Sequence, residues 1–433
     1  MSPLLAPLFA QAVSLQLGDR TEGRYVDLRG TRLYEASTMP SVGLSVSERR
    51  SQFQLAYRPA LVLSPIDTAP RQLYAFHQLA ASVSYVLPRT TLTLGSAFGI
   101  GALNLKLVGV QGLQPANADV MPNAGTPTAG SPTPGGAPTT GAPTTGAPTT
   151  GAPTTGAPAT PGGAITQAPE ANQRVRFYTS TTTLNLAQRL TKEAQLAVLA
   201  GSTTTNGLDD PSRQFYPRLH AWTLGGNTTY TYGYSKQERF IGAASLIKTW
   251  SSNDNQAAVL NMLLTWAHQF NPRTVGALGA GFNVTRFSQA DGLAGFSVFP
   301  TFNLGVTHRV PVGRGGLGFT VGAYSSPALD PLRALVDPRL GVTANISYTR
   351  KKLFISTTGS TAISVAPDGN NAGALNFAQA EARAGYQLGD VTAIDTGARV
   401  TRQTYGGQNV IPTSWAAFVG VTLGYSALLA GGR

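Results

Sequence analysis

The clearest indication of fold class is the stretch GVTANISYTR, residues 341–350. Its apolar residues occupy every second position and alternate with small polar ones, in the order Val342, Thr343, Ala344, Asn345, Ile346, Ser347, Tyr348 and Thr349. Successive side chains of a β-strand point to opposite faces, so a period of two indicates a strand. The stretch therefore predicts a strand with one apolar and one small, polar face.

The same alternation recurs along most of the chain. It is clear in residues 52–58, 302–309, 378–388 and 415–425, whereas helical periodicity of comparable length is hard to find. These segments are about as long as a tilted strand that crosses a bilayer, and longer than the roughly five or six residues typical of soluble proteins. Small polar residues would make a poor globular core. We therefore expect the apolar face to meet lipid and the polar face to line a wet interior.

Composition agrees with a membrane-embedded sheet. The chain has 433 residues, of which 12% are charged and 42% hydrophobic, with 49 glycines and no cysteine. No uninterrupted apolar run is long enough for a transmembrane helix, which needs about 18 residues or more. The absence of cysteine excludes thiolate metal sites, cysteine nucleophiles and disulfide frameworks. Backbone groups in hydrocarbon must all be paired, so the predicted sheet has to close into a barrel.

The spacing of the connections predicts the number of strands. Eight short connections alternate with eight longer ones, and one further strand within residues 14–36 precedes them, joined through an outer loop near Thr38–Pro40. This arrangement predicts an all-β fold: a closed antiparallel transmembrane β-barrel of about 18 strands, with 16 as the alternative. Bacterial barrels of one chain have even strand numbers, short periplasmic turns and longer outer loops.

The hairpin near Gly389 allows a prediction of register. Polar residues are odd-numbered in both 379–387 and 395–403. A three-residue turn then places either Arg383 opposite Asp395 or Glu381 opposite Arg399. Either register brings opposite charges together across the interior face, which is a favourable cross-strand arrangement.

The last strand carries a resemblance to a known class. Gly420, Leu423 and Tyr425 are similar to the Gly-x-x-hydrophobic-x-aromatic signal of Gram-negative outer-membrane β-barrels. The chain departs from that signal at Phe418, where a polar residue is usual, and by continuing to Arg433. The resemblance, to porin-like and polysaccharide-export-like barrels, implies a bacterial outer-membrane location. It also implies the barrel-assembly machinery, membrane lipid and lipopolysaccharide as partners.

Two segments stand apart from the barrel, which we expect to span residues 13–433. Residues 1–12 resemble the end of a secretory signal peptide, although no basic residue precedes the apolar part; a frayed apolar terminus is the alternative. Residues 106–173 form a long outer loop rich in Gly, Ala, Pro and Thr, and Gly136–Thr160 consists of GAPTT-type repeats. Proline at every fifth position prevents regular structure, so we interpret the repeats as a flexible spacer.

No pattern of catalytic, cofactor-binding or metal-ligating residues is found, so we expect no enzyme and no cofactor. The four histidines are far apart and lack ligand spacing: His77, His220, His268 and His308. Gly276, Gly279 and Gly281 lie inside a strand with no following helix, which favours close packing over nucleotide binding. The formal net charge of +12 is not gathered on a helix, and we do not expect nucleic acid binding.

The location of the charges leads to two hypotheses of function. Basic residues gather in the predicted periplasmic turns, notably Arg49, Arg50, Arg350, Lys351 and Lys352. The predicted lumen-lining set is Arg58, Arg309, Gln379, Glu381, Arg383, Asp395 and Arg399. A basic lumen favours a channel for anionic solutes or for export of an anionic polysaccharide, with a periplasmic export partner at the turns. The alternative is a surface protein without an open pore, whose barrel anchors the Thr/Pro-rich loop.

Overall fold

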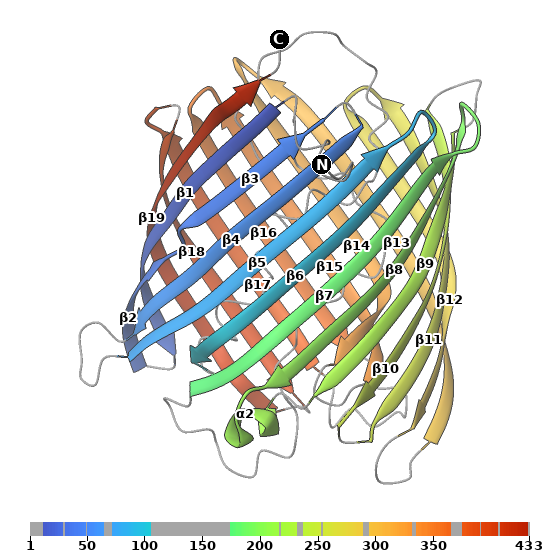
Figure 1. Cartoon of the computed structure of the whole chain (residues 1–433), viewed down its shortest axis with the longest axis horizontal. Coiled ribbons are helices and arrows are strands. Elements are labelled where there is room, and N and C mark those ends of the chain that lie inside the picture. Colours follow the sequence, from blue (N-terminus) through green and yellow to red (C-terminus); the bar gives the residue numbers. More distant parts are fainter. Residues whose placement is uncertain are drawn as a thin grey trace, which may run out of the picture.

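The computed structural model shows a barrel of long, tilted strands (Figure 1). It describes residues 12–28, 31–48, 50–64, 72–104, 174–215, 218–231, 237–252, 254–288, 294–330, 335–364, 375–389, 391–405 and 408–431. All but Ala12 of the predicted signal peptide, together with Arg49 and the whole predicted 106–173 loop, lies outside these residues. No helix in the described part is long and apolar enough to cross a membrane.

The described elements are nineteen strands and one short helix. The strands are β1 (Ala12–Leu28), β2 (Thr31–Thr38), β3 (Ser41–Ser47), β4 (Ser51–Ser64), β5 (Gln72–Val86), β6 (Thr90–Asn104), β7 (Arg174–Arg189), β8 (Ala194–Gly207), β9 (Leu219–Thr231), β10 (Glu238–Ser251), β11 (Gln256–Asn271), β12 (Thr274–Ser288), β13 (Ala294–Val312), β14 (Gly315–Asp330), β15 (Leu335–Arg350), β16 (Leu353–Ser364), β17 (Leu375–Gln387), β18 (Thr392–Tyr405) and β19 (Gln408–Gly431). Helix α2 (Asp210–Phe215) lies between β8 and β9.

Consecutive strands pair antiparallel, and the last strand closes on the first. β19 pairs with β1 along the whole length of β1, from Ala12 opposite Gly431 to Leu28 opposite Ser414. β2 and β3 share one position in the barrel, because both lie between β1 and β4. The predicted closed barrel of eighteen strands is therefore confirmed.

The predicted outer loop near Thr38–Pro40 is wrong. Leu28 pairs with Thr31, so the chain reverses between those two residues. Met39 and Pro40 instead interrupt the second strand, between β2 and β3. Proline has no backbone N–H to donate to a ladder, which explains why the strand is broken there.

The two faces of the sheet differ as the alternation predicts. Large apolar side chains on the outward phase are exposed, including Leu264 at 61% and Val419 at 57%. Tyr85 and Phe270 are exposed near the ends of β5 and β11, and the exposed Trp415 lies opposite Asp27 near the end of β1, which is typical of interfacial girdles. Tyr425 is exposed six residues before the end of β19. Buried Thr265, Asn283 and Thr285 lie on the opposite, inward phase.

The inward face is not uniformly polar. Several inward side chains toward the end with the long connections are apolar and buried: Val62, Tyr74, Phe76, Phe177, Ile247, Val259 and Phe287. The rings of Phe76 and Phe177 pack 5.4 Å apart. The inward phase therefore combines a polar wall with a packed apolar layer near that end.

The two ends of the barrel are distinct. The strand ends joined by short turns, and the starts of β1 and β4, lie at the upper end in Figure 1, while α2 and the strand ends that flank the longer connections lie at the lower end. Asp209 begins α2 by accepting a hydrogen bond from the backbone N–H of Ser212 at 2.9 Å, and hydrogen bonding to Ser212 lowers the pKa of its carboxyl. Since periplasmic turns are short, we assign the lower end to the cell exterior.

Candidate channel interior

The inward faces of β1, β17 and β18 carry a network of charged side chains beside the seam where β19 closes on β1. Arg20 donates to Glu22 and to Asp395, each at 3.1 Å. Arg24 pairs with Glu22, and Arg383 pairs with Asp395. The carboxylates are the most buried members, with side-chain exposures of 6% for Glu22 and 2% for Asp395.

Gly420 makes this network possible. It lies opposite Glu22 on one side and opposite Asp395 on the other. A Cβ at this position would lie 2.8 Å from Asp395 Oδ1 and 3.1 Å from Arg20 Nη2. The missing side chain therefore leaves the space in which Arg20 of β1 reaches Asp395 of β18 across β19.

The predicted interior charges of the β17–β18 hairpin face each other. The register places Glu381 opposite Arg399, one of the two predicted alternatives. Arg399 Nε donates to Glu381 at 2.7 Å. Arg383 faces Gly397 directly and reaches Asp395 diagonally, while its guanidinium lies 5.3 Å from the Phe354 ring centroid. Both predicted ion pairs therefore form, although only one is directly cross-strand.

The other predicted lumen residues lie on the inward phase of separate strands. Gln379 follows the phase of Glu381 on β17, and Arg58 shares that of buried Val62 on β4. Arg309 continues the phase of buried Thr307 toward the short-turn end of β13. The structure thus places all seven predicted residues on the interior wall and brings Glu381, Arg383, Asp395 and Arg399 together.

Sequence reasoning missed other inward charges. Arg20, Glu22 and Arg24 lie in the strand whose register could not be predicted, and Glu35 of β2 is buried directly opposite Arg24. Arg189 and Arg239 lie on the inward phases of β7 and β10 at the short-turn end. Arg189 and Arg239 could have been predicted from the alternation within their own strands, if the interior wall had been extended to the residues next to the short turns.

The predicted basic turns lie at the short-turn end. Arg50, Arg350, Lys351 and Lys352 are exposed, and Lys352 Nζ donates to the backbone oxygen of Leu388 at 3.4 Å. Lys351 occupies the left-handed region with φ of 49°, as a tight turn requires. These side chains therefore lie in two of the turns at the end that we assign to the periplasm.

The predicted assembly signal divides between the two faces of β19. Gly420 faces inward, whereas Leu423 and Tyr425 are exposed on the outward face at 47% and 57%. The unusual Phe418 is buried on the inward phase, and its ring lies 2.5 Å from where a Cβ of Gly397 would be. The departure from the usual signal therefore has a packing explanation.

The histidines lie on the outward phase, away from the lumen. Tyr57 hydrogen-bonds His77, Thr274 hydrogen-bonds His308 and Glu238 pairs with His268. Within the described residues, no group of three or more His, Cys, Asp or Glu could hold a metal ion.

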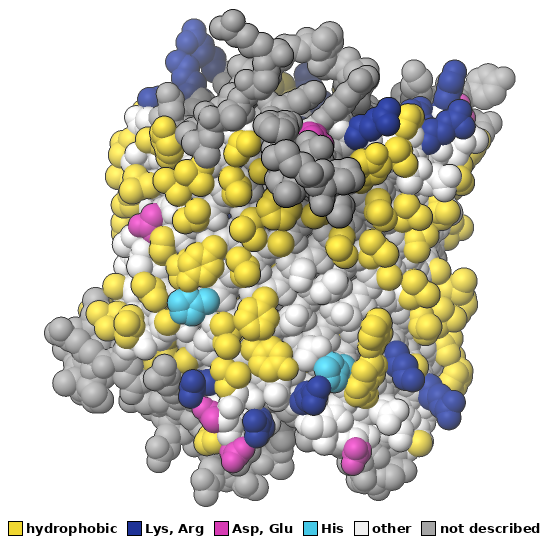
Figure 2. Space-filling view, viewed as in Figure 1, with side chains coloured by type: hydrophobic (Ala, Val, Ile, Leu, Met, Phe, Trp, Pro, Cys, Tyr) yellow, Lys and Arg dark blue, Asp and Glu magenta, His cyan; other side chains and the backbone are white. Residues whose placement is uncertain are grey.

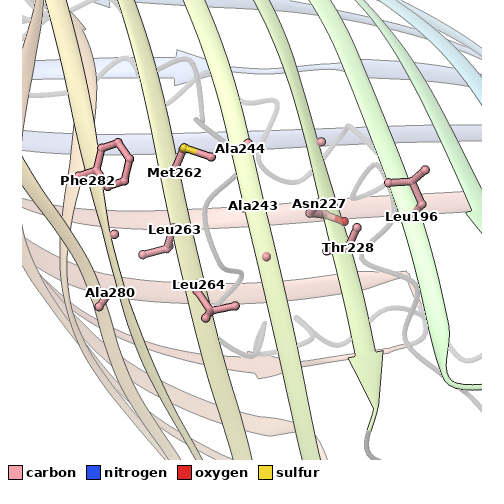
Figure 3. Close-up of a pocket in the computed structure, with 13 residues that line it drawn as sticks. Leu196, Asn227, Thr228, Ala243, Ala244, Met262, Leu263, Leu264, Ala280 and Phe282 are labelled. Atoms are coloured by element: carbon pink, nitrogen blue, oxygen red, sulfur yellow. The ribbon is translucent and has the colours of Figure 1, made fainter.

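A groove of about 510 Å³ lies over β8–β12 (Figure 3). It forms where small residues such as Gly226, Gly242 and Ala244 lie beside larger ones. Met262 and Phe282, which also line it, are exposed on the outward phase. The groove therefore belongs to the apolar wall that faces lipid and not to the lumen.

Comparison with known proteins gives a family match and several similar solved structures. A model of the EpsX exopolysaccharide export family matches residues 137–429. A search of curated proteins gives no match. Similar solved structures include OpdK from Pseudomonas aeruginosa, at 9% identity over 97% of this chain and 100% of that chain, with a TM-score of 0.46.

Two further similar structures come from other bacteria. OccAB3 from Acinetobacter baumannii is 9% identical over 96% of this chain and 99% of that one, with a TM-score of 0.45. The FrpB iron transporter from Neisseria meningitidis (F3-3 variant) is 9% identical over 93% of this chain and 63% of that one, with a TM-score of 0.49. The predicted resemblance to porin-like and export-like outer-membrane barrels is confirmed at the level of class by the closed barrel and the export-family match.

Proposed function

The chain belongs to the EpsX exopolysaccharide export family, and we propose that its barrel is an outer-membrane channel through which an exopolysaccharide leaves the cell. The observation that carries this proposal is the family match over residues 137–429, which spans β7 to β19. Closure of eighteen strands adds support, because a barrel of this size has room for an aqueous path unless loops fill it.

The charges of the interior wall favour an anionic polymer. Among the described side chains on the inward phase, arginines outnumber acids. The arginines are Arg20, Arg24, Arg58, Arg189, Arg239, Arg309, Arg339, Arg383 and Arg399, and the acids are Glu22, Glu35, Glu381 and Asp395. A low-dielectric wall focuses the field of this excess along the lumen, which concentrates anions there.

The excess of arginine over acidic residues is unevenly distributed along the interior wall. At the β17–β18–β1 wall, each predicted arginine is ion-paired: Arg383 with Asp395 and Arg399 with Glu381. Arg189 and Arg239, at the short-turn end, form no ion pair within the described residues. We therefore expect recruitment of anions to depend on the periplasmic mouth more than on the seam.

The test is single-channel conductance of the purified, refolded chain in a planar bilayer, with the reversal potential measured under a salt gradient. We expect steady, anion-selective openings, and the selectivity should fall when Arg189 and Arg239 both become Gln. The matched control is Glu381→Gln with Arg399→Gln, which removes one charge of each sign and should leave selectivity unchanged.

Two results would argue against the proposal. A correctly folded barrel that never opens, with or without added anionic polysaccharide, would favour the surface-anchor hypothesis. If the Arg189/Arg239 variant were as anion-selective as the unmodified chain, the proposed pore would stand but the proposed anionic substrate would be wrong.

We also propose that a periplasmic export partner with an acidic surface docks on the basic turns. Arg50, Arg350, Lys351 and Lys352 are exposed around the short-turn end and support this arrangement. Replacement of all four by Gln should abolish cross-linking to periplasmic proteins in intact cells, while the conductance of the isolated channel persists. Unchanged cross-linking would contradict the proposal.

A further inference from the structure

A second group of basic residues lies on the outward wall, near the end that we assign to the cell exterior. Lys248 of β10 lies three residues before the strand ends at Ser251, and Arg286 of β12 lies two residues before Ser288. Both are exposed, and both follow the outward phase set by the exposed Leu246 and Phe282. They therefore project from the barrel into the membrane interface and not into the lumen.

The sheet register puts these two cations in one row. Lys248 pairs with Ala258 of β11, and Ala258 pairs with Arg286. Neighbouring antiparallel strands lie about 5 Å apart, so the two backbones are about 10 Å apart. Long basic side chains span that distance from both sides, and the methyl group of Ala258 leaves a notch between them.

Aromatic residues flank the row at each end. Trp222 pairs with Lys248 on one side and Phe296 pairs with Arg286 on the other; they are 58% and 68% exposed. Figure 2 shows basic side chains among hydrophobic ones near the lower right edge of the barrel, over β10 and β11. Cations set between exposed aromatic rings at this depth suit a ligand with an anionic headgroup and apolar chains.

The surroundings leave the positive charge available. Within the described residues, neither Lys248 nor Arg286 forms an ion pair. Arg218 adds a third cation nearby; its Nε donates to His220 at 3.0 Å, and the His220 ring stacks on Trp250 at 5.4 Å. The carboxylate of Asp254, on the β10–β11 connection, is exposed and forms no ion pair with them.

We propose that Lys248 and Arg286, with Ala258 between them, bind a phosphate group of a phosphorylated glycolipid in the outer leaflet. The charges are complementary, since two exposed cations face one dianionic group. Acyl chains below that group then lie along the exposed apolar side chains that follow in the same strands, Leu246 and Leu260. The site concerns the outer wall, so it does not depend on what the channel carries.

Lipid binding to the full-length, detergent-purified chain tests the proposal, with native mass spectrometry as the readout. The probes are bisphosphorylated lipid A, the same lipid with both phosphates removed, and inorganic phosphate. We expect Lys248→Gln with Arg286→Gln to weaken binding of the phosphorylated lipid by roughly ten- to thirty-fold, since each basic residue near a lipid surface contributes somewhat less than a factor of ten. Ala258→Phe, which fills the notch and keeps both charges, should also weaken it.

The matched control is Arg273→Gln with Arg314→Gln, which removes two exposed cations from the turns at the opposite end and should bind the phosphorylated lipid as the unmodified chain does. Equal loss in this control would overturn the site. The proposal would also be overturned if the Lys248/Arg286 variant bound normally or if the dephosphorylated lipid bound as tightly. If millimolar inorganic phosphate displaced the lipid, the two cations would be a binding site for free phosphate, and the proposed glycolipid ligand would be wrong.

Discussion

The guanidinium of Arg20 donates a 3.1 Å hydrogen bond to Asp395, although β19 lies between the two strands that carry them. The residues are 375 positions apart in the chain. Gly420 lies between them and offers no side chain to obstruct the contact. Because Asp395 is almost wholly buried and also accepts from Arg383, this contact links the two ends of the chain at the point where the barrel closes.

Substitution of Gly420 should therefore weaken closure. Gly420→Ala places a methyl group 2.8 Å from Asp395 Oδ1, so a buried ion pair has to shift. We expect the free energy of unfolding to fall by about 1–3 kcal/mol. Urea unfolding of the refolded chain in lipid, followed by tryptophan fluorescence, would measure the change independently of the cellular assembly machinery.

Gly424→Ala is the matched control for that measurement. Gly424 lies on the same phase of the same strand, and a Cβ there meets nothing within 4 Å. We expect a change within about 0.5 kcal/mol. If the two variants lost equal stability, the loss would come from backbone effects of alanine in β19, and the cross-seam contact would not be its cause.

The directly opposed pair Glu381 and Arg399 should tolerate an exchange of its charges. Glu381→Arg or Arg399→Glu alone puts like charges opposite each other and should lower the free energy of unfolding by about 1–2 kcal/mol. The double exchange restores an opposite pair and should recover most of that loss. A double variant whose loss equals the sum of the single losses would show that the pair does not interact.

The sequence predicted the outward face better than the inward one for a physical reason. Every second residue of a strand faces lipid and has to be apolar. The outward orientation of residues such as Val342 and Val419 can therefore be predicted from the neighbouring sequence alone. The interior imposes no single requirement: Phe76 packs on Phe177 from another strand, and both are buried on the inward phase. Such packing depends on which strands meet in space, which alternation does not encode.

Register could be predicted only where a short turn links the strands. Glu381 and Arg399 belong to one hairpin, so turn length restricts their pairing to two alternatives. Arg20 and Asp395 meet through closure of the barrel, and no turn relates β1 to β19. The loop predicted near Pro40 was wrong, because proline occurs both where a single strand is interrupted and in loops between strands. The residue alone does not distinguish the two cases.

Close packing at Gly281 gives a third prediction. A Cβ at Gly281 would lie 1.9 Å from the backbone oxygen of Met262 and 2.8 Å from the Cα of Leu263. Gly281→Ala should therefore push β11 and β12 apart and cost about 1–3 kcal/mol, as overpacking does. Gly316→Ala, where a Cβ meets nothing within 4 Å, should leave the stability unchanged. Heat-dependent migration of the folded barrel in gels reports both, and equal midpoints would contradict the steric argument.

Removal of the Asp395 carboxylate should make the channel more selective for anions. Asp395→Asn takes one negative charge from the interior wall and leaves Arg20 and Arg383 without their shared anionic acceptor. One elementary charge about 10 Å from a permeating ion in a watery lumen changes the ion's energy by about 0.4 kcal/mol, so the permeability ratio should rise by about two-fold. The rise should be present at about 0.01 M salt, where the screening length is about 30 Å, and nearly vanish at about 1 M, where it is only about 3 Å. Reversal potentials at both salt concentrations measure this rise.

The control is Asp254→Asn, which also removes one negative charge but does so on an exposed outer connection. A fall in anion selectivity in the Asp395 variant, or the same rise in the Asp254 variant, would show that the seam network does not face the path of the ions.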